Sequence, residues 1–176
     1  MHIGHIMFKT LGFTMSEAII TIAIISIIAA IGTPYFNNML ISNEVNQIKK
    51  ILTIYIQKAK SDAQIHHKNV TLCASTDLIT CSNDWSRGFI GFFDDNRNRT
   101  RERSEQILYA NTIPSKYGTL DWRGTLRVNS VTFQGDTGLP RGSNGSFFYC
   151  MNNSNNHLKI ILSNMGQIRS EMVSTC

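Results

Sequence analysis

The chain has 176 residues, of which 42% are hydrophobic and 16% charged, and its formal net charge is +5. The polar part from Glu44 onward, roughly 130 residues, is long enough for one compact domain with its own core, which excludes a chain of several such domains. The mild positive charge permits binding to a polyanion such as DNA or anionic lipid, but it does not demand it.

A long apolar run, residues 18–31, begins near the N-terminus and contains no charged side chain. The segment 13–33 would form about 31 Å of helix, which matches the hydrocarbon thickness of a membrane. Glu17 lies at the start of this segment, and the next charged residue is Glu44. Because a charge near the centre of a membrane helix costs roughly 2.5–3.5 kcal/mol, this lone carboxylate indicates an interaction with a partner.

The N-terminal residues differ from a general secretory signal, which is cleaved after its apolar region behind small residues. Here Gly12 precedes the apolar run, and the segment 32–36 (GTPYF) that ends the run is a weak cleavage site. The alternative is an uncleaved single-span anchor. In either case Lys9 favours a cytoplasmic N-terminus, which predicts a protein of the bacterial inner membrane with its head in the periplasm. Translation can start at Met1 or Met7, and the sequence leaves both open.

The hexapeptide Gly12-Phe13-Thr14-Met15-Ser16-Glu17 resembles the processing site of type IV prepilins and type II secretion pseudopilins. The resemblance implies that residues 1–12 are a leader peptide. It implies that a prepilin peptidase cleaves between Gly12 and Phe13 and N-methylates Phe13. It also implies that Glu17 pairs with the terminal amine of a neighbouring subunit during assembly.

A helical pattern extends from Phe13 to about His66, with Pro34 as its only interior breaker. We expect a kink at Pro34, because proline removes one helical hydrogen bond and because the same resemblance implies it. Beyond Pro34, apolar residues recur every three or four positions, and the positions between them, including Glu44, are polar. This stripe predicts a helix that lies against a sheet. Its members are Ile41, Val45, Ile48, Leu52, Tyr55 and Ala59.

After His67 the pattern changes to short β-type runs separated by Gly, Asn, Asp and Pro clusters. Because the gaps between consecutive runs have the length of turns, residues 67–176 are expected to form one β-rich head with antiparallel sheets. The fold class is therefore α+β and pilin-like: a long N-terminal transmembrane helix packed on a C-terminal antiparallel β-sheet head. The expected strands are 70–74, 89–93, 106–110, 125–128, 131–134, 147–151, 158–163 and 167–173.

Four cysteines, Cys73, Cys81, Cys150 and Cys176, all lie beyond the apolar segment. An even number in the exported part of a chain predicts two disulfides formed in an oxidising compartment. Three pairings are possible. We favour Cys73 with Cys81, which closes a short loop, and Cys150 with Cys176, which fixes the C-terminus. No Cys-x-x-Cys motif is present in the sequence, which argues against zinc and thioredoxin-like sites.

The head carries several landmark segments, which are 70–75 (VTLCAS), Cys81, 85–89 (WSRGF), 92–95 (FFDD), 147–150 (FFYC) and 158–169. They resemble the FimT/GspH branch of the same family. The resemblance implies either a minor pilin of a type IV pilus, used in DNA uptake in some members, or the H-type minor pseudopilin of type II secretion. The choice between the two machines stays open. The implied partners are other pilin or pseudopilin subunits and the assembly platform.

The turn before the last expected strand bears on DNA binding. Some FimT-like members end their last hairpin in Gly-Arg-x-Arg, which presents two guanidinium groups to DNA. In this chain the segment Gly166-Gln167-Ile168-Arg169 keeps Arg169 but has Gln167 in place of the first arginine. The lost cation removes one phosphate contact, so DNA binding through Gln167 and Arg169 is the alternative function rather than the main one.

Arginines occupy every second position in the segment 97–103, which would place them on one face of a strand. Because four acidic side chains flank them, we expect a salt-bridged hairpin tip rather than a phosphate-binding patch. The preceding Asp94-Asp95-Asn96 suggests calcium, but we interpret its spacing as lacking the alternating oxygen ligands and the closing glutamate of a calcium loop. No metal ligands are therefore expected.

Catalytic chemistry finds little support. His66 and His67 are adjacent and would point in different directions, and His157 is isolated. The sequence contains no nucleophile elbow, no His-Glu-x-x-His motif and no phosphate-binding glycine loop. We therefore expect neither enzyme activity nor a cofactor. The expected role is a subunit that enters or primes a filament and assists protein secretion, and the alternative is a DNA-binding minor pilin at a pilus tip.

Overall fold

The structure is a computed structural model, which describes residues 12–152 and 154–176, with the backbone alone at Leu126. The expectations for the leader, including a start at Met1 or Met7, lie outside the described residues.

One long helix, α1 (Met15–His66), continues through the boundary between Leu40 and Ile41 that divides the chain into two compact units. The helix predicted over residues 13–66 is therefore present, and it begins at Met15. Pro34 lies inside α1, which continues beyond it. The kink at this residue stays a prediction.

The helix ends at His66 because His67 takes a left-handed conformation, with φ of +52°. A residue of this conformation, usually glycine, commonly terminates a helix. Asn69 then fixes the turn that leads out of α1. Its side-chain oxygen accepts the Gly135 amide at 3.0 Å, and its carbonyl accepts the Asp94 amide at 2.9 Å.

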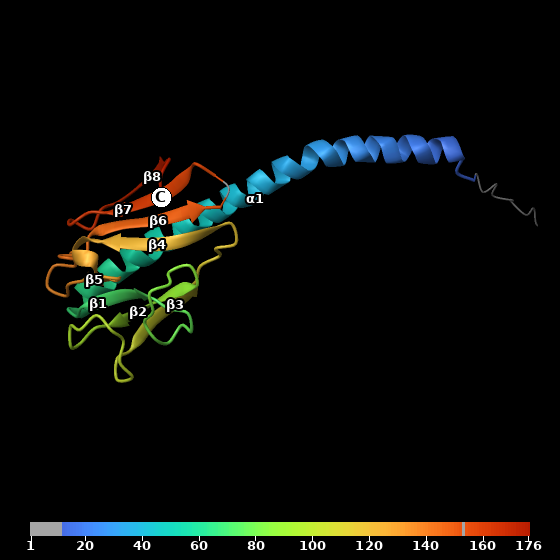
Figure 1. Cartoon of the computed structure of the whole chain (residues 1–176). Coiled ribbons are helices and arrows are strands. Elements are labelled where there is room, and N and C mark those ends of the chain that lie inside the picture. Colours follow the sequence, from blue (N-terminus) through green and yellow to red (C-terminus); the bar gives the residue numbers. More distant parts are fainter. Residues whose placement is uncertain (1–11, 153) are drawn as a thin grey trace, which may run out of the picture. The chain divides into compact units, whose positions relative to one another are not determined.

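The head consists of two four-stranded sheets (Figure 1). The strand order is β3-β2-β1-β5 in the first sheet and β4-β6-β7-β8 in the second. Every pair of neighbouring strands is antiparallel, as predicted. The first sheet contains β1 (Val70–Ala74), β2 (Gly88–Phe93), β3 (Ile107–Thr112) and β5 (Ser130–Phe133). The second contains β4 (Gly118–Gly124), β6 (Gly145–Met151), β7 (His157–Leu162) and β8 (Ile168–Val173).

One predicted strand is absent from the connection between the two sheets. Residues 125–128 were expected to be extended, but Thr125–Arg127 forms a 3₁₀ turn, and Arg127 has a φ of +56°. The chain needs this tight turn because it passes here from β4 in one sheet to β5 in the other. The strand before the turn, β4, was not predicted. Its residues alternate between buried and exposed, as expected for a strand with one face on the core.

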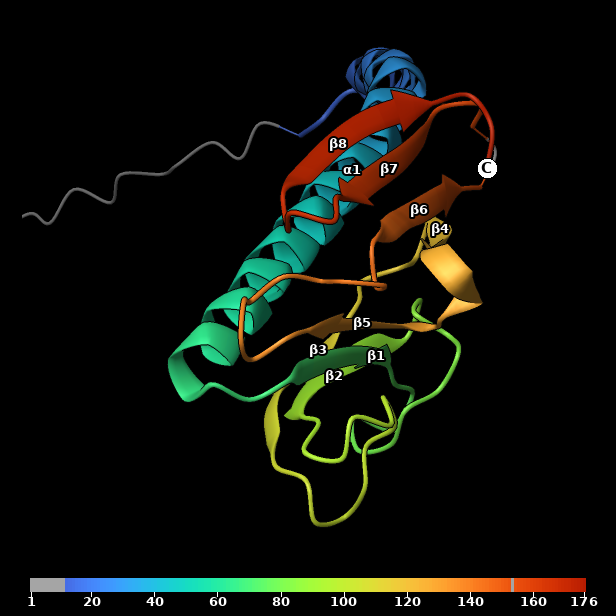
Figure 2. The same cartoon turned by 90° about the vertical axis from the view of Figure 1, so that its left-hand side faces the viewer.

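The main hydrophobic core contains residues of both sheets and of the part of α1 that belongs to the head. Figure 2 shows this part of α1 running beside the strands of the head. Tyr55 of α1 packs edge-on against Phe89 of β2, with ring centroids 5.1 Å apart. The ring centroid of Phe147 in β6 lies 4.9 Å from that of Trp85 and 4.5 Å from that of Trp122. Because Trp85 also approaches Phe89, these rings form a continuous aromatic connection between the sheets.

The apolar stripe predicted on α1 faces this core. Three of its six members are buried, and the other three are partly buried against the core. Glu44 was expected on the polar side of the helix, and this prediction is wrong. Its carboxylate is buried as well, with 8% of the residue exposed. It accepts the Tyr117 amide at 2.9 Å and the phenolic hydroxyl of Tyr149. These two donors compensate for the removal of the carboxylate from water.

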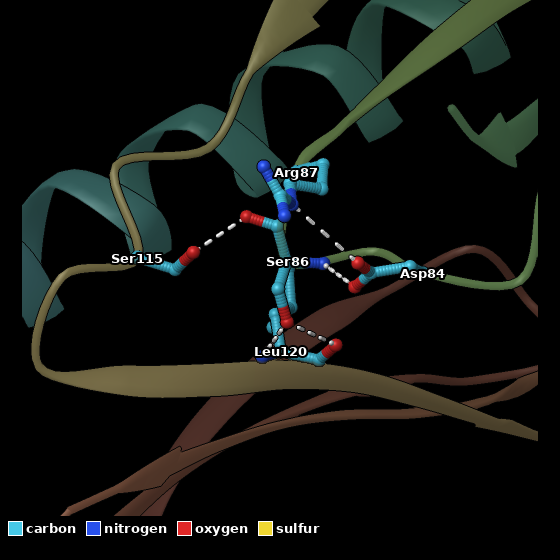
Figure 3. Close-up of polar contacts among 5 residues, drawn as sticks. All are labelled: Asp84, Ser86, Arg87, Ser115 and Leu120. Carbon is cyan, nitrogen blue, oxygen red and sulfur yellow. Dashed lines mark hydrogen bonds and ion pairs between the residues drawn. The ribbon is translucent and has the colours of Figure 1, made fainter. Parts of the chain in front are cut away.

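Ser86 ties the segment before β2 to β4 of the other sheet (Figure 3). Its hydroxyl accepts the Leu120 amide at 2.8 Å and lies 3.3 Å from the Leu120 carbonyl, to which it can donate. Its carbonyl accepts the Ser115 hydroxyl at 2.5 Å, and its amide donates to Asp84 at 2.9 Å. Ser86 belongs to one of the landmark segments of the head, and these contacts give it a role in joining the sheets.

Two disulfides join Cys73 to Cys81 and Cys150 to Cys176, the pairing that we favoured from the sequence. The first closes the segment between β1 and β2. Cys73 is buried beside Ile90 and Phe92, in a small cluster separate from the main core. The second disulfide attaches the C-terminal residue to β6.

Candidate assembly and binding sites

The first candidate site is the start of α1, where Thr14 and Glu17 form a capping box. Glu17 accepts the Thr14 amide at 2.9 Å and the Thr14 hydroxyl at 2.8 Å. In return, the Thr14 hydroxyl oxygen accepts the Glu17 amide at 3.3 Å. Such a box satisfies amides that the first turn of a helix leaves without partners. Phe13, just before the box, is 76% exposed. The roles of Gly12 and Phe13 in processing stay predictions.

The apolar part of α1 is long enough to cross a membrane. One 18-residue window of this helix has a mean hydropathy of 2.2, and none of that window is buried. Its hydroxyl groups are satisfied within the helix: Thr21 donates to the Ala18 carbonyl at 2.9 Å and Ser26 to the Ile22 carbonyl at 2.6 Å. Polar groups that bond inside their own helix are the ones a lipid environment tolerates. This surface therefore suits lipid or the apolar helices of neighbouring subunits.

The second candidate site is the turn between β7 and β8 with the start of β8, where Gln167 and Arg169 lie. Both side chains are exposed. Gly166 has a φ of +69° and lets the chain reverse, while the Ser163 hydroxyl accepts the Gln167 amide at 3.1 Å. The turn lies at a cleft of about 420 Å³.

Lysines of α1 approach the same turn. Lys49 lines the cleft together with Arg169, and none of the described residues that line it is acidic. The Lys60 ammonium lies beside Gly166, within 3.2 Å of where a Cβ would be. Both lysines lie at polar positions beside the members of the apolar stripe, and nothing in the sequence connects them with Arg169. Their spacing of three helical turns was the available signal, but it cannot show which strand lies opposite.

The arginine-rich segment after β2 is a loop, and the prediction that its arginines share a strand face is wrong. The expected salt bridges at a hairpin tip are also absent, because no arginine of this segment forms an ion pair among the described residues. Arg97 and Arg99 line a second cleft of about 670 Å³ together with Lys68, Asp95 and further charged groups of both signs. Lys68 and Asp95 form an ion pair of 3.0 Å across its rim.

The histidines have structural contacts. The His66 ring packs edge-on against Phe93, with centroids 5.1 Å apart, and His157 Nδ1 accepts the Met151 amide at 3.1 Å. Among the described residues, no three His, Cys, Asp or Glu side chains gather closely enough to hold a metal ion as they stand. The polar groups at these positions thus serve the packing of the head.

Comparisons with known proteins agree with this architecture. The family model described as "Type II transport protein GspH" matches residues 52–166. The crystal structure of the type IV minor pilin FimU from Pseudomonas aeruginosa PAO1 in space group P21 has a TM-score of 0.53 and 20% identity, covering 74% of this chain and 90% of that one. The structure of the same protein in space group P65 has a TM-score of 0.50 and 17% identity, covering 74% of this chain and 91% of that one. No curated protein matches the chain. At these identities, the likeness to FimU shows the pilin fold.

Proposed function

Because the chain belongs to the GspH/FimT family of minor pilins and pseudopilins, we propose that it is a subunit of a type IV pilus or of a type II secretion pseudopilus. The subunit enters or primes the filament and thereby assists assembly and protein secretion. Residues 13–33 anchor it in the bacterial inner membrane, with the head in the periplasm. The role is structural, and no catalytic step is assigned to it.

The observation that carries this proposal is the exposed apolar half of α1, with Glu17 as the one carboxylate of this half, in the first turn of the helix. A continuous apolar surface of this length is stable only in lipid or against other apolar helices. A filament of bundled helices offers the second environment. The subunit can therefore move from the membrane into the filament without exposing this surface to water.

Glu17 supplies the contact that favours assembly. Cleavage between Gly12 and Phe13 by the prepilin peptidase leaves a methylated amine at Phe13, and the Glu17 carboxylate of a neighbouring subunit neutralises that amine. Because an unpaired carboxylate in a bilayer is costly, the pairing favours the assembled state. Before assembly, the hydrogen bonds that Thr14 donates to Glu17 partly offset the cost of placing this carboxylate in the bilayer.

The sharpest test is Glu17→Gln, because glutamine keeps the capping box and removes only the charge. Glu17→Ala, the matched variant, removes both. We expect both variants to be processed in a host that carries the assembly machine, giving the intact mass of a chain that begins at methylated Phe13. We expect both to be strongly depleted from purified filaments.

Two results would contradict parts of this proposal. If the glutamine variant entered filaments like the wild type while the alanine variant did not, capping rather than charge pairing would govern assembly. If the wild-type mass still included the leader, the protein would be a plain membrane anchor.

A second candidate function, binding of DNA by the head, rests on the cleft beside the β7–β8 turn. Lys49 and Arg169 line it, the other described residues of its lining are uncharged, and Lys60 lies beside Gly166. The two lysines supply cations near the position where Gln167 has replaced an arginine. A cluster of this kind can bind phosphates in a salt-dependent manner.

A gel-shift assay on the head fragment from Ile41, which contains the hydrophobic core, tests this second function. If it is correct, Arg169→Ala and Lys49→Ala each reduce retardation at low salt and lower the salt slope by about one unit. Arg123→Ala is the control, because Arg123 is paired with Asp121 at 3.1 Å outside the cleft. No retardation of the wild-type fragment at low salt would remove DNA binding as a function.

A further inference from the structure

The loop between β2 and β3 alternates oxygen-bearing side chains with arginines. Its twelve residues, 94–105, read DDNRNRTRERSE. A calcium loop of twelve residues takes its ligands from positions 1, 3, 5, 7, 9 and 12. In this chain all six positions carry a side-chain oxygen, and a glutamate closes the loop. The six residues are Asp94, Asn96, Asn98, Thr100, Glu102 and Glu105. The expectation that the segment lacks the spacing of a calcium loop is therefore wrong.

The carboxylates at both ends of this loop are buried. Asp94 is 1% exposed and Glu105 is 4% exposed, and neither forms an ion pair among the described residues. One oxygen of Asp94, Oδ2, accepts the Thr71 hydroxyl at 2.9 Å and the Arg99 amide at 3.1 Å. The other oxygen, Oδ1, is buried and has no hydrogen-bond partner among the residues that the structure describes. Buried carboxylates are normally paired with a cation or bound to a metal, and the Oδ1 oxygen of Asp94 is the one that such a partner would contact.

The Asp94 carboxylate lies between the loop and β1, because Oδ2 accepts both the Arg99 amide of the loop and the Thr71 hydroxyl of β1. Arg99 occupies position 6, where calcium loops have an invariant glycine, and its φ is +64°. The side-chain oxygens of Asn96 and Asn98 each accept one backbone amide, at 3.0 and 2.8 Å. An amide oxygen has two lone pairs, so each keeps one for a metal ion.

We propose that the loop 94–105 binds one calcium ion, with Asp94 Oδ1 as its buried anchor. The donors are all oxygens, which suits a hard cation, and six donor positions suit Ca²⁺ better than the smaller Mg²⁺, which usually keeps several waters. Three carboxylates supply the negative charge. The four arginines stand at positions that supply no ligand. One of them, Arg101, points to the disulfide loop and donates to the Ile79 carbonyl at 3.5 Å.

Calcium binding requires a local rearrangement of the two glutamates. Glu102 now accepts the side-chain amides of Asn96 and Asn98, and Glu105 accepts the amides of Asp95 and Glu102. Both carboxylates therefore bond to groups of the loop itself, and they must leave these partners to reach an ion held by Asp94. Because this movement and the nearby arginines oppose binding, we expect a dissociation constant of roughly 10⁻⁴–10⁻³ M, in the range of extracellular calcium modules.

Equilibrium dialysis of the full chain in detergent micelles against radioactive calcium tests the proposal. The wild type is expected to bind about one ion per chain, and millimolar CaCl₂ is expected to raise the melting temperature. Asp94→Asn is expected to weaken binding at least about tenfold. Because this buried variant can fail to fold, Asn98→Ala provides a second one. Asn98 is exposed, and its loss should weaken binding severalfold in a folded protein.

The matched control is Asp95→Asn, which removes the same charge from position 2, where no ligand is expected. Asp95 instead pairs with Lys68. The affinity of the Asp95→Asn variant for calcium should stay within about twofold of that of the wild type. The proposal is overturned if the wild type binds no calcium at millimolar concentration, or if MgCl₂ stabilises the fold as well as CaCl₂. It is also overturned if Asp95→Asn loses as much affinity as Asp94→Asn, because the attraction would then be diffuse.

Discussion

Tyr149 of β6 donates its phenolic hydrogen to the carboxylate of Glu44 on α1, across 105 positions of sequence. The same carboxylate oxygen accepts the Tyr117 amide at 2.9 Å. Gly118 makes room for this contact, since a Cβ there would lie 2.7 Å from Tyr149 Cζ. The position of α1 on the second sheet therefore depends on a buried carboxylate with two donors, in addition to apolar packing.

Replacing Tyr149 by phenylalanine should lower the free energy of unfolding of the head by about 1.5–3 kcal/mol, because a buried charged acceptor loses a donor. The measurement is urea unfolding of the fragment from Ile41. The control is Glu171→Gln, which breaks an exposed ion pair of 2.9 Å with Lys159 and should cost less than about 1 kcal/mol. Equal losses in the two variants would show that the contact with Glu44 contributes no more than a surface pair.

The head should lose stability in alkaline solution. Burial, and then the hydrogen bond to Glu44, raises the pKa of Tyr149 above its ordinary value, and burial raises the pKa of Tyr109. Below the ordinary tyrosine pKa of about 10, folded and unfolded chains both keep these protons, so the stabilisation is complete. Above it, the unfolded chain releases protons that the folded chain retains, and stability falls as the pH rises.

Melting temperatures of the fragment between neutral pH and strongly alkaline pH would measure this loss. The double variant Tyr109→Phe/Tyr149→Phe is expected to be less stable at neutral pH but to decline less steeply in alkali. An equally steep decline in the double variant would assign the alkaline loss to other groups.

Periodicity in the sequence was sufficient to predict α1, its apolar stripe and most strands. These predictions succeed because burial on one side imposes a repeat of 3.6 residues on a helix and of two on a strand. The stripe members Ile48, Leu52 and Ala59 are buried as a direct consequence. The unpredicted strand β4 shows the same alternation, but the segment is bounded by Gly118 and Gly124 and resembles a turn in composition.

The failures concern residues whose surroundings come from distant parts of the chain. Glu44 was expected on the polar face because a charged residue is normally exposed. Its burial depends on a donor, Tyr149, that lies 105 positions away in the sequence. Lys49 could not be connected with Arg169, because pairing a helix face with a turn requires the tertiary fold. The prediction of a shared strand face for the arginines of 97–103 was wrong for a different reason. A repeat of two is typical of a strand, but the ligand positions of a calcium loop follow a similar repeat.

Removing the C-terminal disulfide should destabilise the head. The bond between Cys150 and Cys176 closes a loop with a sequence separation of 26. The loop-entropy model assigns about 3.5 kcal/mol to a loop of this size. The variant Cys150→Ala/Cys176→Ala should lose about this amount in urea unfolding of the oxidised protein. In the presence of a reductant, wild type and variant should converge, and equal stability of the two oxidised proteins would contradict the prediction.

The pairing of Gly91 on β2 with Tyr109 on β3 provides a test of packing between the strands. The Tyr109 ring covers Gly91 so closely that an added Cβ would overlap the ring, with Cζ 2.6 Å away. The ring cannot move freely, because it also packs against Tyr55 of α1, with centroids 5.3 Å apart, and Lys58 lies over it. Gly91→Ala should therefore cost about 1–3 kcal/mol through overpacking.

A double-mutant cycle distinguishes this contact from a general preference of β2 for glycine. In a Tyr109→Ala background the ring is absent, so Gly91→Ala should cost at least about 1 kcal/mol less than in the wild type. Urea unfolding of the four proteins gives the coupling energy directly. If Gly91→Ala costs the same in both backgrounds, the ring of Tyr109 is not the reason that this position requires glycine.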